Sequence, residues 1–141
     1  MSYFFERILP TAEQIELLYE LLKQRTHVIS HRSLPNFEEH QDFVNNHPYL
    51  HWFLLHDTSN LLGSFYLKKD NSIGLNLVEY SKENLAACVN FISDNFSPEE
   101  PMASVIPKYF YVNISYSNES ALSALQELGL NPLQISLRLE K

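Results

Sequence analysis

Three strand-like stretches follow one another closely in the middle of the chain, and they restrict its possible folds more than any other feature. Residues 50–56, 61–68 and 72–79 are rich in the aromatic and branched side chains that strands favour. Short polar turns at residues 57–60 and 70–71 separate them. Connections this short join antiparallel neighbours, because parallel strands need a long crossover. The sequence therefore predicts a local antiparallel meander.

Helical and strand patterns on both sides of the meander complete the element order. Helices are expected over residues 11–25, 36–47, 81–96 and 118–128, and further strands over residues 3–9, 109–114 and 133–139. This order mixes a meander with helical crossovers. We expect an α/β (α+β mixed) fold, with a central mixed, largely antiparallel sheet of about six or seven strands flanked by about four helices.

Capping residues mark several of the expected helix ends. Thr11 and Gln14 have the spacing of a capping box. Asn36 and Ser81 are good N-caps for the helices that follow them. Gly129 is expected to adopt the left-handed conformation that ends the last helix.

Composition and charge indicate one domain that spans residues 1–141. The 45% hydrophobic and 13% aromatic residues supply enough apolar surface for one core. Ten Lys and Arg against seventeen Asp and Glu give a formal net charge of −7. The basic residues are scattered, with Lys68 and Lys69 the only adjacent pair, so no nucleic-acid partner is expected.

Cysteine usage and the first ten residues indicate a cytoplasmic location. Cys88 is the only cysteine, which excludes an internal disulfide and suits a reducing compartment. Glu6 and Arg7 stand where a signal peptide would need an unbroken apolar stretch. No apolar run approaches membrane-spanning length, so no membrane association is expected.

The six histidines do not form a recognisable metal site. His27 and His31 are four residues apart but fall in a polar connector. His51 and His56 are separated by an odd number on one strand, so they are expected on opposite faces. Since no Cys or acidic residue completes a ligand set, no metal is expected.

The segment YVNISYSNESALSALQELGL, which ends at Leu130, resembles the last conserved block of GNAT acyltransferases. In that block a strand leads to Asn, then Ala three positions later, a helix, and a Gly-Phe pair; here these positions hold Asn118, Ala121 and Gly129 with Leu130. The earlier segment WFLLHDTSNLLGSFYLKKDNSIGLNLVE looks like the second to fourth strands of the family. The element order agrees over nearly the whole chain.

The resemblance implies an acyl-CoA-dependent N-acyltransferase, with acetyl-CoA as cosubstrate and an amine as acceptor. In such enzymes the amine attacks the thioester directly, so no covalent enzyme intermediate is needed. The resemblance implies that backbone groups of the fourth strand and the start of the next helix bind the acyl-CoA. The corresponding residues here are Leu77, Val78, Glu79, Lys82 and Asn84, together with Asn118.

The resemblance also implies positions for the acceptor and for proton transfer. The connector between the two early helices offers candidate acceptor contacts, unless it is only a solvated loop: His27, His31, Arg32 and Ser33. Glu79 is the candidate base for the acceptor amine, and Tyr116 or Ser123 the candidate replacement for the proton-donating tyrosine of the family. The acceptor class stays open: amino sugars, amino acids, polyamines, antibiotics or protein amines.

Two departures from the family pattern keep a second hypothesis open. The segment from Glu79 to Ala86 has none of the glycines with which the family binds pyrophosphate, and Glu83 adds a repelling charge. The tyrosine that many members carry after the Asn is Leu125 here. The alternative is therefore a catalytically silent GNAT-like module for binding or regulation. With either function, a monomer or a homodimer is expected.

Overall fold

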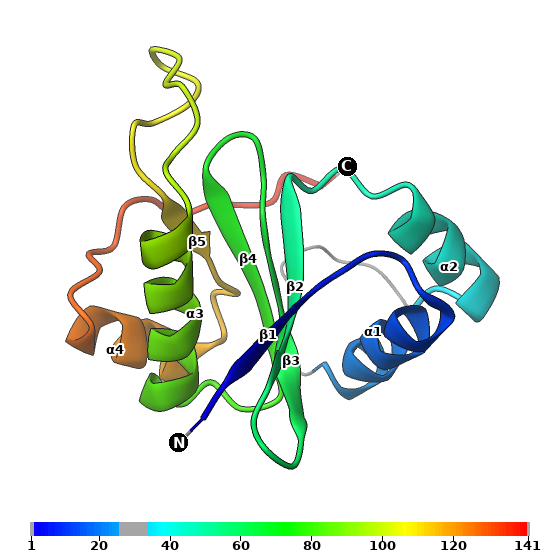
Figure 1. Cartoon of the computed structure of the whole chain (residues 1–141). Helices are drawn as coiled ribbons and strands as arrows, with labels where there is room; N and C mark the ends of the chain where they lie inside the picture. The colour runs from blue at the N-terminus through cyan, green and yellow to red at the C-terminus, as the bar shows by residue number, and fades with distance from the viewer. Residues whose placement is uncertain (1, 26–33, 141) are drawn as a thin grey trace.

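The computed structural model describes residues 2–25 and 34–140, which form an α/β fold around one sheet (Figure 1). The elements in chain order are β1 (Phe4–Arg7), α1 (Ala12–Gln24), α2 (Phe37–Asn45), β2 (His51–His56), β3 (Leu61–Leu67), β4 (Ser72–Leu77), α3 (Lys82–Asn95), β5 (Tyr111–Asn113) and α4 (Glu119–Glu127). The predicted element order is confirmed except for its last strand.

The sheet has the order β1-β2-β3-β4-β5. The pairs from β1 to β4 are antiparallel, and β4 pairs with β5 in parallel. The meander predicted from the short polar turns is therefore confirmed. The parallel pair follows because the chain crosses over through α3 before it returns as β5.

The described part of the sheet has five strands rather than the predicted six or seven. The strand predicted over residues 133–139 is wrong for this structure, because those residues are exposed and join no ladder. Their alternation of apolar and polar residues fits a strand, but a strand needs a neighbour for its backbone groups.

Local sequence fixes the position of α1 relative to β1. The predicted capping box at Thr11 and Gln14 is present, with both reciprocal hydrogen bonds. The buried Gln14 side chain also donates to the Glu6 carboxylate at 2.7 Å and to the Arg7 carbonyl at 2.9 Å. One side chain therefore fastens the start of α1 to the end of β1.

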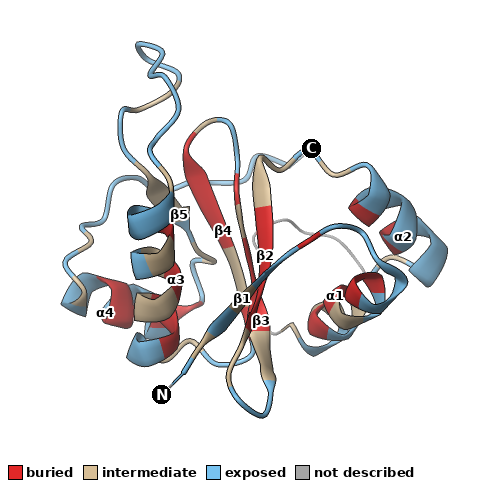
Figure 2. Cartoon of the chain, viewed as in Figure 1, coloured by how far each residue is buried: buried red, intermediate tan, exposed pale blue. Residues whose placement is uncertain are grey.

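Helices cover both faces of the sheet (Figure 2). On one face α1 and α2 pack on a cluster formed by Ile8, Ile15, Leu18, Leu21, Val44, Trp52 and Leu54. On the other face α3 and α4 pack on a larger cluster that includes Phe53, Leu55, Phe65, Leu67, Ile73, Leu77, Leu85, Cys88, Ile92, Ala121, Ala124 and Leu125. Among the described helices, none has the length and apolar character needed to cross a membrane.

Candidate functional site

β4 and β5 pair over three residues only. Residues 72–74 pair with residues 111–113, after which β5 ends while β4 continues to Leu77. Figure 1 shows α3, α4 and β5 together on one side of β4. We call the second half of β4, residues 75–77, together with Tyr80 the β4–β5 fork.

The Tyr80 hydroxyl lies on the β5-facing edge of β4 within the fork. It accepts a hydrogen bond from the Leu77 N–H at 3.3 Å and donates one to the Leu75 carbonyl at 3.3 Å. The Val78 N–H donates to Leu62 of β3, so the Leu77 N–H, one residue earlier, points to the opposite edge. Burial raises the pKa of Tyr80, which keeps its hydroxyl protonated at neutral pH. One side chain thus takes two backbone groups that an added strand would use.

The turn from β4 into α3 is held by side chains. The Ser81 hydroxyl accepts from the Asn84 N–H at 3.1 Å and caps the helix. The buried Asn84 side chain donates to the Glu79 carbonyl at 3.1 Å and accepts from the Tyr3 hydroxyl at 3.2 Å. The Asn84 amide group is therefore already hydrogen-bonded within the protein.

Opposing charges surround the first turn of α3. The Lys82 ammonium lies 3.7 Å from the Glu127 carboxylate of α4, and both side chains are more than half exposed. Glu79 and Glu83 are exposed on the same turn. The helix dipole and Lys82 favour an anion here, while the two carboxylates oppose one.

The other end of the β4–β5 pairing is closed by Asn71, whose side chain is fully buried. Its amide nitrogen donates to the Pro107 carbonyl at 2.8 Å and to the Glu99 carbonyl at 3.2 Å, and its amide oxygen accepts from the Glu99 N–H at 2.7 Å. The Asn71 carbonyl accepts from the Tyr111 N–H of β5 at 3.1 Å. Its φ of 70° lies in the left-handed region that Asn tolerates better than most residues. Asn71 therefore joins the β3–β4 turn, β5 and the loop before β5.

On the α4 side the residues of the resemblance have different surroundings. Asn118 is buried and caps α4 through a hydrogen bond from the Ala121 N–H at 3.1 Å. Gly129 has the predicted left-handed conformation, with φ of 98°. Leu125 lies in the core, while the Tyr116 side chain is 94% exposed. The Tyr116 side chain thus lies outside the packed core.

An aromatic layer covers the opposite face of β4. The Tyr49 and Tyr66 rings stack with centroids 3.7 Å apart. A Cβ atom at Gly74 would lie only 2.0 Å from Cζ of Tyr66, so the tyrosine ring rests directly on the backbone of β4. Burial raises the pKa of both hydroxyls, and the positive charge of Arg25 acts in the opposite direction. The layer therefore lies near the end of α1, where the connector begins.

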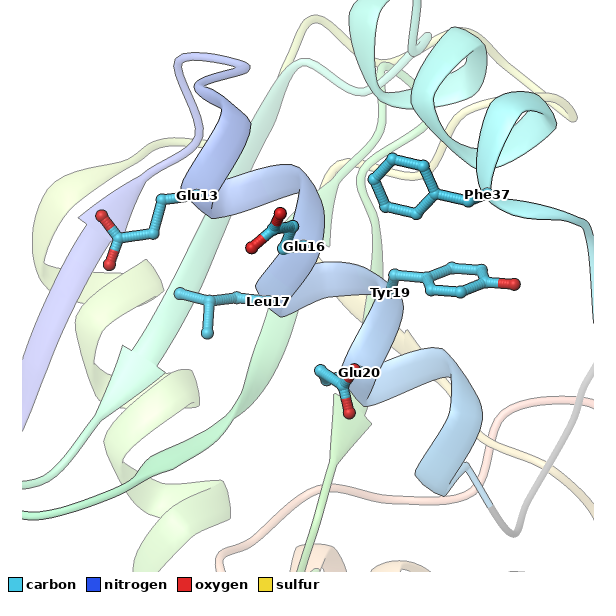
Figure 3. Close-up of a pocket in the computed structure, with 6 residues that line it drawn as sticks. All are labelled: Glu13, Glu16, Leu17, Tyr19, Glu20 and Phe37. Atoms are coloured by element: carbon cyan, nitrogen blue, oxygen red, sulfur yellow. The ribbon is translucent and has the colours of Figure 1, made fainter.

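A separate hollow of about 440 Å³ lies on the outer side of α1, next to α2 (Figure 3). Three carboxylates from α1 border it, those of Glu13, Glu16 and Glu20, together with the rings of Tyr19 and Phe37. The two rings meet edge to face, with centroids 5.3 Å apart. The hollow lies on the other layer of the molecule from α3 and α4 and shares no residue with the fork.

The structure brings together some of the residues predicted from the sequence. Five predicted acyl-CoA contacts lie in the segment from the end of β4 to the start of α3: Leu77, Val78, Glu79, Lys82 and Asn84. The predicted acceptor contacts lie outside the described residues: His27, His31, Arg32 and Ser33. Within the described ranges 2–25 and 34–140, no three His, Cys, Asp or Glu side chains are arranged to hold a metal ion.

Sequence reasoning missed Tyr80 and Asn71. Tyr80 belongs to no motif, and its role depends on a hydroxyl that reaches back to a strand three residues earlier. Asn71 reads as an ordinary turn residue, although its buried contacts are with residues 28 and 36 positions away. The one sequence signal was the absence of glycine from residues 79–86, which indicates that side chains contact the backbone of this turn.

No family model and no curated protein matches this sequence. Solved structures do match. A domain from Methanocaldococcus jannaschii superposes with a TM-score of 0.65 at 10% identity, covering 96% of this chain and 92% of that one. An aminoglycoside acetyltransferase from an uncultured soil metagenomic sample, solved in complex with sisomicin, superposes with a TM-score of 0.52 at 12% identity, covering 99% and 95%. The chain has a GNAT-like fold. At these identities the likeness concerns the fold alone.

Proposed function

We propose that this protein is an acyl-CoA-dependent N-acyltransferase that moves an acyl group, most simply acetyl, directly onto an amine of a small molecule or a protein. The observation that carries the proposal is the fork, where polar backbone groups of Leu75 and Leu77 face the side on which β5 has ended. An extended arm with amide groups can pair with such an edge as an added strand does. The pantetheine arm of coenzyme A has this chemistry.

The Tyr80 hydroxyl would have to leave the edge for that arm to bind. Its hydrogen bonds with Leu77 and Leu75 are each 3.3 Å long, at the weak end of the range for such bonds. A hydrogen bond of ordinary strength contributes only about 0.5–1.5 kcal/mol net. An arm that makes comparable bonds, and buries its own apolar surface, can therefore displace the hydroxyl.

The first turn of α3 is the proposed position of the cosubstrate phosphates. Free N–H groups and the helix dipole attract an anion at this end. Lys82 adds a positive charge, and the exposed Glu127 carboxylate lies 3.7 Å from its ammonium group. Because Glu79 and Glu83 oppose the anion, we expect weaker affinity than a glycine-lined turn would give.

Glu79 and Tyr116 are the proposed groups for proton transfer. Glu79 lies between Leu77 and Tyr80 of the fork and is exposed, so it can accept a proton from the acceptor amine, directly or through water. The exposed Tyr116 hydroxyl would protonate the departing thiolate. The formal net charge of −7 favours a cationic amine as the acceptor, since opposite charges accelerate encounter.

The binding test is calorimetry with acetyl-CoA on the wild type, Tyr80→Phe and the control Tyr49→Phe. Tyr80→Phe removes the competing hydroxyl and keeps the ring, so it should bind acetyl-CoA more tightly than the wild type. Tyr49→Phe alters a hydroxyl in the aromatic layer and should leave the affinity unchanged. Absence of binding by both the wild type and Tyr80→Phe at millimolar ligand contradicts the proposal.

The catalytic test follows turnover with a panel of amines. A general acid or base contributes about 10²–10⁴-fold in rate, so Glu79→Gln and Tyr116→Phe should each lower kcat strongly while acetyl-CoA affinity stays nearly constant. Both side chains are exposed, so the fold should survive. If acetyl transfer slows less than about threefold, positioning alone drives the reaction and these two roles are wrong.

A catalytically silent GNAT-like module is the second candidate, and Tyr80 is the observation that favours it. Its hydroxyl satisfies the strand edge without any ligand, and Leu125 stands where the family tyrosine would be. In that case neither the wild type nor Tyr80→Phe binds acetyl-CoA, and both keep the same fold. The binding test therefore separates the two candidates.

A further inference from the structure

The face of β4 and β5 that is turned towards α1 and α2 carries polar side chains. One row across the sheet joins directly opposed residues of four strands, namely Trp52 in β2, Tyr66 in β3, Gly74 in β4 and Asn113 in β5. Trp52 belongs to the core cluster under α1 and α2, and Tyr66 packs against that cluster, so the row lies on this face. Asn76 shares the face with Gly74, because side chains alternate along a strand. Asn76 and Asn113 therefore place two amide groups beside the fork.

The Tyr66 hydroxyl lies close to both amides. Gly74 has no side chain, so the tip of the Tyr66 ring, with its hydroxyl oxygen, lies where a Cβ atom would stand on β4. The ring is also stacked on Tyr49, with centroids 3.7 Å apart. From Gly74 the backbone of Asn113 is one strand spacing away, roughly 4.8 Å, and that of Asn76 is two residues away, roughly 7 Å. Hydroxyl and amide groups therefore converge on one small patch.

Arg25 adds a positive charge to this patch. Burial raises the pKa of the Tyr49, Tyr66 and Tyr80 hydroxyls, and the positive charge of Arg25 lowers the pKa of all three. The guanidinium is therefore near both the aromatic layer and the fork. The negative charge of Asp70 also acts on Tyr66, but more weakly than that of Arg25. Within the described ranges, no carboxylate lies within ion-pair distance of the half-buried Arg25 side chain.

The position of Arg25 at the end of α1 does not by itself account for these surroundings. A positive charge at a helix C-terminus interacts favourably with the helix dipole. Lys23 already supplies such a charge in the last turn, with its ammonium group 2.7 Å from the Glu20 carboxylate and over the Tyr19 ring. Arg25 instead exerts its charge on hydroxyls of the sheet layer. Lys23 is therefore a matched control for Arg25.

The donors of this patch match a carboxylate. A guanidinium binds a carboxylate through two parallel hydrogen bonds, and its single charge balances that of one carboxylate. Phenol and amide groups can donate to the remaining lone pairs. Because the patch borders the fork, an acceptor held there by a carboxylate keeps its amine near the proposed acyl group. The net charge of −7 attracts the amine of such a zwitterion, and Arg25 retains its carboxylate.

We propose that the acceptor is an amino acid whose carboxylate is bound by Arg25 together with Tyr66, Asn76 and Asn113. This inference rests on the proposed function, since it names the acceptor of the same site. Arg25 determines which amines are used, and it takes no part in proton transfer. Its loss should therefore change the choice of acceptor and leave the affinity for acetyl-CoA unaltered.

The first test offers each standard amino acid with acetyl-CoA and compares every one that is acetylated with the amine that lacks its carboxylate, such as lysine with cadaverine. The wild type should have a higher kcat/KM for the amino acid. Arg25→Gln should lower this kcat/KM by roughly 10–100-fold, the effect of losing hydrogen bonds to a charged group, and leave the value for the amine nearly constant. Acetylation of amines in which the carboxylate brings no advantage overturns the proposal.

Two control variants keep this test specific. Lys23→Gln removes the same charge from the same end of α1 and should keep the preference for the amino acid. Arg25→Lys keeps the charge at residue 25 but not the two parallel hydrogen bonds, so it should retain only part of the preference. If Lys23→Gln lowers the preference as much as Arg25→Gln does, the effect is one of overall charge and the carboxylate site is wrong.

Binding measurements separate this inference from the proposed function. Amino acids are titrated calorimetrically into the protein, with and without coenzyme A, which carries no acyl group. At least one should bind the wild type, and it should bind Arg25→Gln at least tenfold more weakly. If this binding occurs while acetyl-CoA neither binds nor reacts, the proposed function fails and the carboxylate site stands. If acetyl-CoA binds and no amino acid does, or if amino-acid binding does not depend on Arg25, the carboxylate site fails and the acyltransferase stands.

Discussion

The two ends of the β4–β5 pairing are closed by very different means. At one end Asn71 makes three side-chain hydrogen bonds and accepts a backbone bond from β5, all in a fully buried position. At the other end one partly buried hydroxyl, that of Tyr80, makes two bonds of 3.3 Å. Buried polar groups are costly to leave unpaired, whereas partly exposed ones can turn to water. The Asn71 end is therefore built to stay closed, and the Tyr80 end is built to be opened.

The largest expected effect is at the closed end, with Asn71→Ala. This change removes the three side-chain hydrogen bonds of Asn71 to Glu99 and Pro107, and each contributes about 0.5–1.5 kcal/mol net. The alanine also has to hold φ near 70°, which costs roughly a further 1 kcal/mol. We expect a total loss of about 3 kcal/mol or more in the free energy of unfolding, measured by urea denaturation.

Asn71→Gly separates the two contributions. Glycine adopts the same φ without strain, so it should recover only the smaller part of the loss. If Asn71→Ala costs less than about 1 kcal/mol, the two ends do not differ in the way proposed.

Gly74→Ala should have an intermediate effect. Gly74 is the last β4 residue that pairs with β5, so it lies between the Asn71 end and the Tyr80 end. The new Cβ would clash with two ring carbons and the hydroxyl oxygen of Tyr66, and the stacking of this ring on Tyr49 restricts its movement. Overpacking of this kind typically costs about 1–3 kcal/mol. Tyr66→Leu combined with Gly74→Ala should cost less than the sum of the two single changes, because the clash is removed; additive losses would show that no clash exists.

Tyr80→Phe should have a smaller effect, of less than about 1 kcal/mol on unfolding, because the two lost hydrogen bonds are long and water can replace them. The readout that distinguishes the ends is amide exchange. The Leu77 amide should exchange faster in Tyr80→Phe, while the Tyr111 amide, which is bonded to the Asn71 carbonyl, should keep its rate. Equal acceleration at both amides would mean that the whole pairing opens as one unit.

Much of the fold could be predicted because its signals are local. The capping box at Thr11 and the cap at Ser81 depend on residues three positions apart, and the meander depends on two short turns. The predicted strand over residues 133–139 failed for the opposite reason. Its alternation reports a preference for a sheet but does not supply the neighbouring strand.

The candidate site could be predicted only in outline. The resemblance located the segment between β4 and α3. It did not show that the Tyr80 hydroxyl is hydrogen-bonded to the edge of β4, or that the Asn84 amide donates to the Glu79 carbonyl. These contacts depend on how the chain turns back on itself over a few residues. The Asn71 contacts depend on a loop about thirty positions away, which no local pattern encodes.

The smallest expected effect is a dependence of the closed end on acid, through Asp70. Burial alone would raise the pKa of this carboxyl. Hydrogen bonds from the Ser72 hydroxyl at 2.6 Å and the Ser72 N–H at 3.0 Å, with smaller contributions from the Lys68 charge and the Tyr111 hydroxyl, together outweigh it and lower the pKa below its usual value. The folded protein therefore favours the ionised carboxylate more than the unfolded chain does. This contribution is present above the unfolded pKa, near 3.9, and is lost as the pH falls from there through the lower folded value.

We expect the stability difference between the wild type and Asp70→Asn to be constant at neutral pH and to shrink below about pH 4, in urea denaturation repeated across pH. The Tyr80 hydroxyl, whose pKa is raised, does not titrate in this range, so acid should weaken the Asn71 end only. A difference that stays constant down to pH 3, about one unit below the unfolded value, would show that Asp70 contributes nothing through its charge.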